Sequence, residues 1–358
     1  MAAAAYDWDA QVLAEYITDP DIPIEEVAAV LQLCHDDQER LHFARDFSLD
    51  NYNEQQCLDN FRFTADDIHR LCPLLRIPER FSTPNRFHAP GVEVLCIVLN
   101  RLAYPSRFSQ LQEFFHRTKK ECNLFFLLGI EHLYRNFHTR LTDWNQPWLT
   151  QGAIQAYCAA IHAAGSPLQN CWGFIDGTVR KMCKPSRHQR EVFSGHKRFH
   201  GLKFQSVVAP NGLIVNLYGP VPGRRHDAWL LQESDILTHC EATFNDQAGN
   251  PLCLFGDSAY PLRNHLQRPH RGANLTPQQQ NFNASMSSVR MAVEWEFGKI
   301  ISLWAFMDFP KNIKLYKSPV GKLYHVAVFL TNCHTCLYGS QTSRHFGVDP
   351  HTLEQYLY

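Results

Sequence analysis

The sequence predicts an α/β protein in which a mixed sheet flanked by helices follows a helical N-terminal region. Three observations favour this fold class. Hydrophobic residues make up 45% of the 358-residue chain, which is enough for a substantial core. Apolar residues recur at helical spacing between residues 60 and 150. From residue 171 onward, short apolar runs typical of strands alternate with helical segments.

Charge is distributed unevenly along the chain, although the formal net charge is only -1. Residues 1–60 carry fourteen Asp and Glu against two Arg, whereas residues 177–203 carry eight Lys and Arg against one Glu. Because local fields govern binding more than total charge does, a balanced total does not exclude an anionic partner such as nucleic acid. We interpret residues 1–52 as an acidic N-terminal arm with one amphipathic stretch, "IEEVAAVLQLCHDDQERLHFARDF".

Residues 53–150 are predicted to be a helical region. "TADDIHRLCPLL" begins with a Thr that can cap a helix and places two acids in the first turn, as helix N-termini prefer. Three further helical segments follow it: "PGVEVLCIVLNRLAY", "SRFSQLQEFF" and "KKECNLFFLLGIEHLYRNFHTRL". Short helices joined by a tight turn suit a helix-turn-helix DNA-binding module, and an ordinary helical bundle explains the same pattern equally well.

The sheet is predicted from residue 171 onward. The order is a strand, a hairpin around Asn211-Gly212, a helix, a strand, a polar loop and a long helix: "CWGFID", "LKFQSVVAP" with "LIVNLYGPV", "HDAWLLQESDILTHCE", "LCLFGDSAYP", residues 262–286 and "SSVRMAVEWEFGKIISLWAF". The last helix is apolar nearly all round, which predicts that it is buried. We assign residues 165–340 to one α/β domain and residues 341–358 to a C-terminal tail.

Neither a membrane span nor a disulfide framework is predicted. No run of about 20 apolar residues is present, and the N-terminus lacks the basic and apolar regions of a secretory signal. The twelve cysteines are scattered singly apart from Cys333 and Cys336, as free thiols in a reducing compartment would be. A zinc site at this pair is disfavoured because no second ligand pair stands nearby. We expect an intracellular protein.

Two aspartates stand at matching places, each at the end of an apolar strand. Asp176 and Asp257 are both followed by a small residue, and ligand sites in α/β sheets favour such strand ends. The helix can supply a third acid, either Glu294 or Glu296, and periodicity does not choose between them. Clustered carboxylates repel one another unless cations lie among them, and hard oxygen ligands select Mg²⁺ or Mn²⁺. The alternative is that both aspartates form turns or cap helices.

The strand and helix segments together resemble the catalytic domain of the Harbinger (PIF) transposase-derived nucleases, which belong to the DDE superfamily of endonucleases. The motifs that carry the resemblance span residues 165–340: "GFIDGTVRKMCKP", "FSGHKRFHGLKFQSVVAPNGLIVNLYGPVPGRRHDAWLLQES", "LFGDSAYP" and "VEWEFGKI". A weaker likeness extends into the helical region, where the family carries a helix-turn-helix-like segment. The resemblance implies a ribonuclease-H-like fold for residues 165–340.

The family match implies a catalytic and metal-binding triad of Asp176, Asp257 and Glu294 holding two Mg²⁺ or Mn²⁺ ions. It favours Glu294 over Glu296, although Trp295 stands where the family usually has a basic residue. The implied activity is cleavage and transfer of DNA strands, in which metal-polarised water attacks a phosphodiester without a covalent enzyme intermediate. The family also works in the nucleus with a separate Myb-like DNA-binding partner, and the sequence leaves the oligomeric state open.

Basic residues after Asp176 are predicted to line the path of the nucleic acid. They are suited to phosphate contacts: Arg180, Lys181, Lys184, Arg187, Arg190, Lys197, Arg198, Lys203, Arg224 and Arg225. A solvated basic face is the plainer explanation of such a run. Asp227 suits a helix N-cap, which is the more common role. The more specific hypothesis is that Asp227 lies beside the metal site and supports the metal ligands without binding the ions itself.

Two other functions remain open from the sequence. The first is a domesticated descendant of a transposase that binds DNA or protein without cutting, although intact acids at three positions speak against decay. The second is a zinc-dependent hydrolase, which requires a His and Cys ligand set that the sequence does not assemble.

Overall fold

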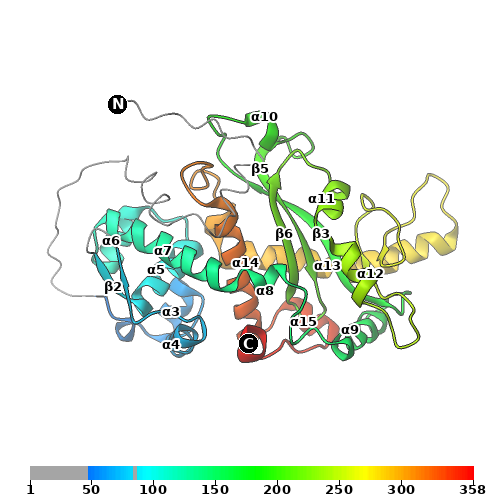
Figure 1. Cartoon of the computed structure of the whole chain (residues 1–358), viewed down its shortest axis with the longest axis horizontal. Helices are drawn as coiled ribbons and strands as arrows, with labels where there is room; N and C mark the ends of the chain where they lie inside the picture. The colour runs from blue at the N-terminus through cyan, green and yellow to red at the C-terminus, as the bar shows by residue number, and fades with distance from the viewer. Residues whose placement is uncertain (1–46, 84–86) are drawn as a thin grey trace.

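The computed structural model describes residues 47–83 and 87–358, and Figure 1 shows how they are arranged. Most of the predicted acidic arm, residues 1–46, lies outside the described residues. Residues 49–83 and 87–115 lie on one side of helix α14 (Val320–Tyr338) and the sheet on the other, α7 (Lys119–Phe137) and α8 (Thr139–Thr142) run across α14 to the sheet, and the first half of α13 (Pro277–Leu303) extends away from the sheet (Figure 1). Within the described ranges, no helix is long and apolar enough to span a membrane.

The N-terminal region is helical, as the sequence predicts. Its helices are η1 (Leu49–Asn51), α3 (Glu54–Phe61), α4 (Ala65–Leu74), α5 (Gly91–Ala103), α6 (Phe108–Phe115), α7 (Lys119–Phe137) and α8 (Thr139–Thr142). Thr64 and Thr118 cap α4 and α7 by accepting hydrogen bonds from the third helical backbone N–H. An antiparallel pair that the pattern did not indicate, β1 (Arg80–Ser82) with β2 (His88–Pro90), interrupts the helices.

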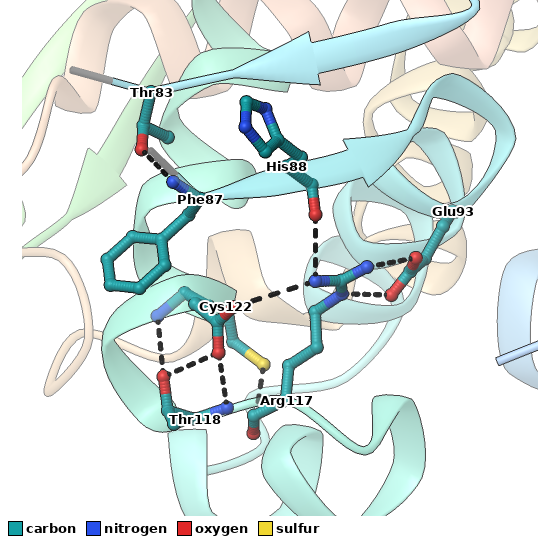
Figure 2. Close-up of polar contacts among 8 residues, drawn as sticks. Thr83, Phe87, His88, Glu93, Arg117, Thr118 and Cys122 are labelled. Carbon is teal, nitrogen blue, oxygen red and sulfur yellow. Dashed lines mark hydrogen bonds and ion pairs between the residues drawn. The ribbon is translucent and has the colours of Figure 1, made fainter. Parts of the chain in front are cut away.

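A buried ion pair ties this hairpin to the helices around it (Figure 2). The Arg117 guanidinium forms a two-pronged pair with Glu93 of α5, whose side chain is 3% exposed, and donates to the backbone oxygen of His88 at 3.0 Å. A partnered charge of this kind is tolerated inside a protein because each carboxylate oxygen has its donor. Arg117 therefore holds the start of α7, the first turn of α5 and strand β2 together.

The sheet is mixed, as the sequence predicts. Its strands are β3 (Cys171–Lys181), β4 (Phe193–Ser194), β5 (Phe199–Val208), β6 (Ile214–Pro222), β7 (Cys253–Phe255) and β8 (Leu266–Gln267). β3 is central, because it pairs antiparallel with β5 and parallel with β7. β6 continues the sheet beyond β5 as the hairpin partner, and β8 continues it beyond β7. This architecture is consistent with a ribonuclease-H-like fold.

Helices flank the sheet and complete the described chain: α9 (Gln151–Ala163), α10 (Gln189–Val192), α11 (Asp227–Glu233), α12 (Ile236–Thr243), α13 (Pro277–Leu303), η2 (Ala305–Asp308), α14 (Val320–Tyr338), α15 (Gln341–Phe346) and α16 (Leu353–Leu357). The single helix expected after the hairpin is divided into α11 and α12, because Asp235 adopts a left-handed conformation (φ 51°) between them. Residues 341–358 form the two helices α15 and α16, and the apolar residues of α16 are buried.

Helix α13 begins ten residues earlier than the sequence pattern predicts. Thr276 caps it in a capping box with Gln279, and Pro277 occupies the first helical position, where its missing N–H costs nothing. These start signals lie in a polar stretch, so hydrophobic periodicity does not detect them. The expected burial on all sides is also wrong, since Met291 is 45% exposed and Glu294 lies at the surface.

One hydrophobic core runs through the helical region and the sheet region. Lys322 of α14 and Glu131 of α7 form a buried ion pair at 2.9 Å across the junction. On the surface, Arg70 of α4 binds Glu354 of α16 at 2.7 Å. The two regions therefore pack on each other through a shared core, and the division into domains at residues 53–150 and 165–340 stays a prediction.

Candidate active site

Asp176 lies in the middle of the central strand β3, so the expectation that it ends a strand is wrong: the pairing with β5 continues five residues beyond it to Lys181. Asp176 is opposite Ser206 of β5, and its Oδ1 accepts a hydrogen bond from the Gly177 backbone N–H at 2.8 Å. The side chain is 20% exposed, so part of the carboxylate remains open to solvent. Burial raises the pKa of Asp176, the charge of Arg290 opposes this rise, and the charge of Asp257 adds to it. Asp176 and Asp257 are therefore close enough for the charge of one to affect the pKa of the other.

Asp257 reaches the site from the parallel strand next to β3. It comes two residues after β7, whose Phe255 is paired with Phe174 of β3. The carboxylate Oδ1 accepts a hydrogen bond from the Ala259 backbone N–H at 2.8 Å, which is the turn-forming contact that Asp often makes. The turn role and the site role coexist, because this bond engages one oxygen and leaves the other for a further partner.

Helix α13 links Glu294, but not Glu296, to Asp176, and it does so through Arg290. Arg290, one helical turn before Glu294, binds Asp176 Oδ2 at 3.0 Å through Nη1 and Glu294 Oε1 at 3.1 Å through Nη2. The Glu294 side chain is 57% exposed. One guanidinium thus bridges the strand carboxylate of Asp176 and the helix carboxylate of Glu294, and Arg290 and Glu294 share one face of α13.

Glu296 occupies a different environment. It is 1% exposed and lies beside Ser340 and Thr342 of the α15 segment, where burial raises its pKa. Lys299, one turn later, donates to Thr335 Oγ1 at 2.8 Å, and burial lowers its pKa to about 8. Lys299 therefore joins α13 to α14, while the two buried Glu296 oxygens have no hydrogen-bond partner among the described residues and are offset by the nearby Lys299 charge.

Asp227 does not cap a helix, contrary to the more common role expected for it. It is the first residue of α11, His226 stands at the N-cap, and no side chain makes a cap hydrogen bond there. Instead its Oδ1 binds Lys203 Nζ at 2.8 Å. A Cβ atom added at Gly177 would stand 2.1 Å from the same oxygen, so Asp227 packs directly against the backbone that follows Asp176.

The ten basic residues expected to contact phosphates divide into three groups by solvent exposure. Lys203 is 8% exposed and pairs with Asp227, so it cannot reach a phosphate and the expectation for it is wrong. Arg180 and Arg225 are partly buried, with their guanidinium groups over Tyr324 and Trp229. The exposed members are Lys181, Lys184, Arg187, Arg190, Lys197, Arg198 and Arg224.

Two residues of the site were not found from the sequence. The Tyr260 phenol is buried, donates to Gln205 Oε1 at 3.2 Å, and has a pKa raised first by burial and then by the charges of Asp227, Asp176 and Asp257. It therefore lies among the acids. Arg290 is the other, and its spacing of four residues from Glu294 was the available signal, since such pairs share a helix face.

The acids fit a divalent cation by chemistry and by charge. Asp176, Asp257 and Glu294 offer only hard carboxylate oxygens, which is the donor set that Mg²⁺ or Mn²⁺ prefers. Asp176 and Glu294 already share one cation, the Arg290 guanidinium. Among residues 47–83 and 87–358, however, no three His, Cys, Asp or Glu side chains are grouped closely enough to hold a metal as they stand. Metal binding at these residues would thus require Arg290 and Glu294 to move.

Comparison with known proteins identifies one part of the chain. No curated protein and no solved structure matches the chain. The matched segment begins one residue before Asp176, contains Asp227, Asp257 and Glu294, and ends within α14. Residues 175–332 match the model of the family described as DDE superfamily endonuclease.

Proposed function

We propose that the protein is a metal-dependent DNA endonuclease of the Harbinger transposase type, with Asp176, Asp257 and Glu294 as its catalytic acids. The observation that carries this proposal is that Asp176 on β3 and Asp257, two residues beyond the adjacent parallel strand β7, are close enough for one charge to raise the pKa of the other, with Glu294 joined to Asp176 through Arg290. The family match supports it, since DDE superfamily endonucleases act on DNA and generally use divalent metals.

Under this proposal each part of the site has a distinct task. Bound Mg²⁺ or Mn²⁺, as two ions, would supply the activation of a water molecule and the stabilisation of the leaving oxygen. Asp176 and Asp257 would hold the ions rigidly, because both are placed by central strands of the sheet. Asp227 and Lys203 would fix the backbone behind Asp176 through their contact with Gly177. The exposed cations after β3 would bind DNA phosphates.

A second function is favoured by one observation, the Arg290 bridge. A guanidinium that satisfies Asp176 and Glu294 removes their need for a metal, as expected for a domesticated descendant that binds DNA or protein without cutting. The same exposed cations would serve such a protein. Metal binding separates the two functions, because only the nuclease requires it.

The proposal extends to the cellular setting. A transposase-type nuclease acts on chromosomal DNA, so we place the protein in the nucleus, together with a Myb-like DNA-binding partner. Both points are supported only by the resemblance to the Harbinger family. Imaging of a tagged full-length chain, and co-purification with the candidate partner, would test them separately.

The decisive experiment compares the wild type with Asp257→Asn. Mn²⁺ binding is measured by calorimetry, nicking of supercoiled plasmid is measured with and without Mn²⁺, and circular dichroism checks folding. We expect the wild type to bind and nick, and the folded variant to lose both. Nicking or Mn²⁺ binding retained by Asp257→Asn would refute the role of this residue. A wild type that binds DNA, does not bind Mn²⁺ and does not cleave DNA would favour the non-catalytic function.

A further inference from the structure

A second group of cations lies between η2 and α14, outside the segments that the sequence singled out. Residues 309–319 form two successive turns. Buried Ile313 and Leu315 anchor this segment in the core. Three exposed lysines on its surface form what we call the lysine strip: Lys311, Lys314 and Lys317. Within the described part of the chain, none of the three makes an ion pair.

The lysine strip lies directly beside the basic stretch that follows β3. The backbone N–H of Cys183 donates to Ile313 O at 2.9 Å, and the Cys183 thiol donates to Lys311 O at 3.8 Å. Burial raises the pKa of the Tyr316 phenol, and the nearby charge of Arg187 opposes that rise. The two hydrogen bonds from Cys183 therefore place the lysine strip next to the basic stretch that follows β3, and the two form one continuous basic surface.

The other edge of the strip faces the N-terminal helices. Asn312 Nδ2 donates to the backbone oxygen of Pro105 at 3.3 Å, in the connection between α5 and α6. Arg107, exposed in the same connection, extends the positive surface toward that region. Figure 1 agrees with this placement, since the orange segment before α14 lies between the N-terminal helices and the end of the sheet that carries α10.

We infer that the lysine strip binds the phosphates of a DNA duplex and joins the proposed nuclease site to the helical region along a single DNA path. Three amino groups without internal partners are free to replace counterions on the duplex, which is the main source of electrostatic affinity. Asp308 and Glu191 are the acidic neighbours, and they offset only part of this charge.

The strip would contact flanking DNA and not the phosphate that is cleaved. Lys181 ends β3 five residues beyond Asp176, which corresponds to roughly 16 Å along a strand. The lysine strip lies further on, beside Cys183. This inference rests on the proposed function for its substrate, because it assumes that the protein binds DNA.

The test measures binding of a fluorescein-labelled, mixed-sequence DNA duplex by the full chain in EDTA, across a series of salt concentrations. The variant is Lys311→Gln, Lys314→Gln and Lys317→Gln combined. The plot of log affinity against log salt has a negative slope, and each lost phosphate contact reduces its magnitude by about 0.9. We therefore expect the magnitude of the slope to decrease by roughly 2 to 3 in this variant. The matched control replaces the same three lysines by Arg, which keeps the charge, and should leave the slope unchanged. A second control, Arg344→Gln, removes an exposed cation of α15.

The outcomes separate this inference from the proposed function. An unchanged slope in the folded Gln variant, with wild-type DNA binding intact, overturns the lysine strip and leaves the nuclease proposal standing. A decrease of about 0.9 in the magnitude of the slope with Arg344→Gln, the same loss per removed charge, would show a general charge effect and would also overturn it. If the wild type binds no duplex, the DNA substrate itself is refuted, and the inference fails with it. Thermal unfolding of every variant checks that a reduced salt dependence of DNA binding does not result from unfolding of the protein.

Discussion

Replacement of Arg290 by Gln should destabilise the metal-free protein and tighten its binding of Mn²⁺. The Asp176 and Arg290 side chains are each 20% exposed, so removing the guanidinium leaves a mostly buried carboxylate without its cation. Breaking a fully buried pair costs about 3–5 kcal/mol, and the residual exposure here reduces this to about 2 kcal/mol. The bond to Glu294, which is 57% exposed, adds only about 0.3 kcal/mol after solvent screening. Gln has nearly the same helix propensity as Arg, so α13 itself should not weaken.

The assay for Arg290 combines a double-mutant cycle with metal titration. Chemical denaturation of wild type, Arg290→Gln, Asp176→Asn and the double variant, all in EDTA, gives the coupling between the two residues, and we expect about 1–2 kcal/mol. Mn²⁺ should restore the stability of Arg290→Gln, because the metal replaces the lost cation. Coupling near zero would refute the buried bridge. Mn²⁺ binding weakened by Arg290→Gln would show that the guanidinium organises the acids for metal and does not compete with it.

Two further predictions follow from the acids and from a buried histidine. Glu294→Gln should abolish Mn²⁺ binding with little change in unfolding free energy, whereas Glu296→Gln should leave Mn²⁺ binding intact; calorimetry of both variants would reject this assignment if Glu296→Gln lost the metal. Burial lowers the pKa of His325 to about 4, and its Nε2 lies 2.8 Å from Gly219 O. Because the unfolded histidine binds a proton near its ordinary pKa of about 6.5, stability should be full above that pH and fall as the pH drops toward 4. Denaturation at several pH values should show that His325→Gln loses less unfolding free energy between neutral pH and pH 4 than the wild type does. An equal loss in the two proteins would exclude His325 as the cause.

The fold was largely readable from the sequence where local signals are strong. The hairpin of β5 and β6 follows from two apolar runs around Asn211-Gly212, and α4 follows from its Thr64 cap and the two acids in its first turn. The start of α13 was missed because its capping signals lie in a polar stretch. The pair β1 and β2 was missed because each strand has only three residues and depends on Arg117, which is distant in the sequence.

The sequence by itself indicated which residues are candidates for the chemistry: two aspartates that each follow an apolar run, a pair of glutamates on one helix, and a run of cations. Only the tertiary structure decided how they are used. It set Glu294 beside Asp176 and buried Glu296 elsewhere, withdrew Lys203 from solvent into a pair with Asp227, and introduced Arg290 and the lysine strip. The physical reason is that local sequence specifies backbone conformation and side-chain type. The solvent exposure and ionic partner of a side chain, in contrast, depend on segments that become neighbours only when the sheet and helices pack.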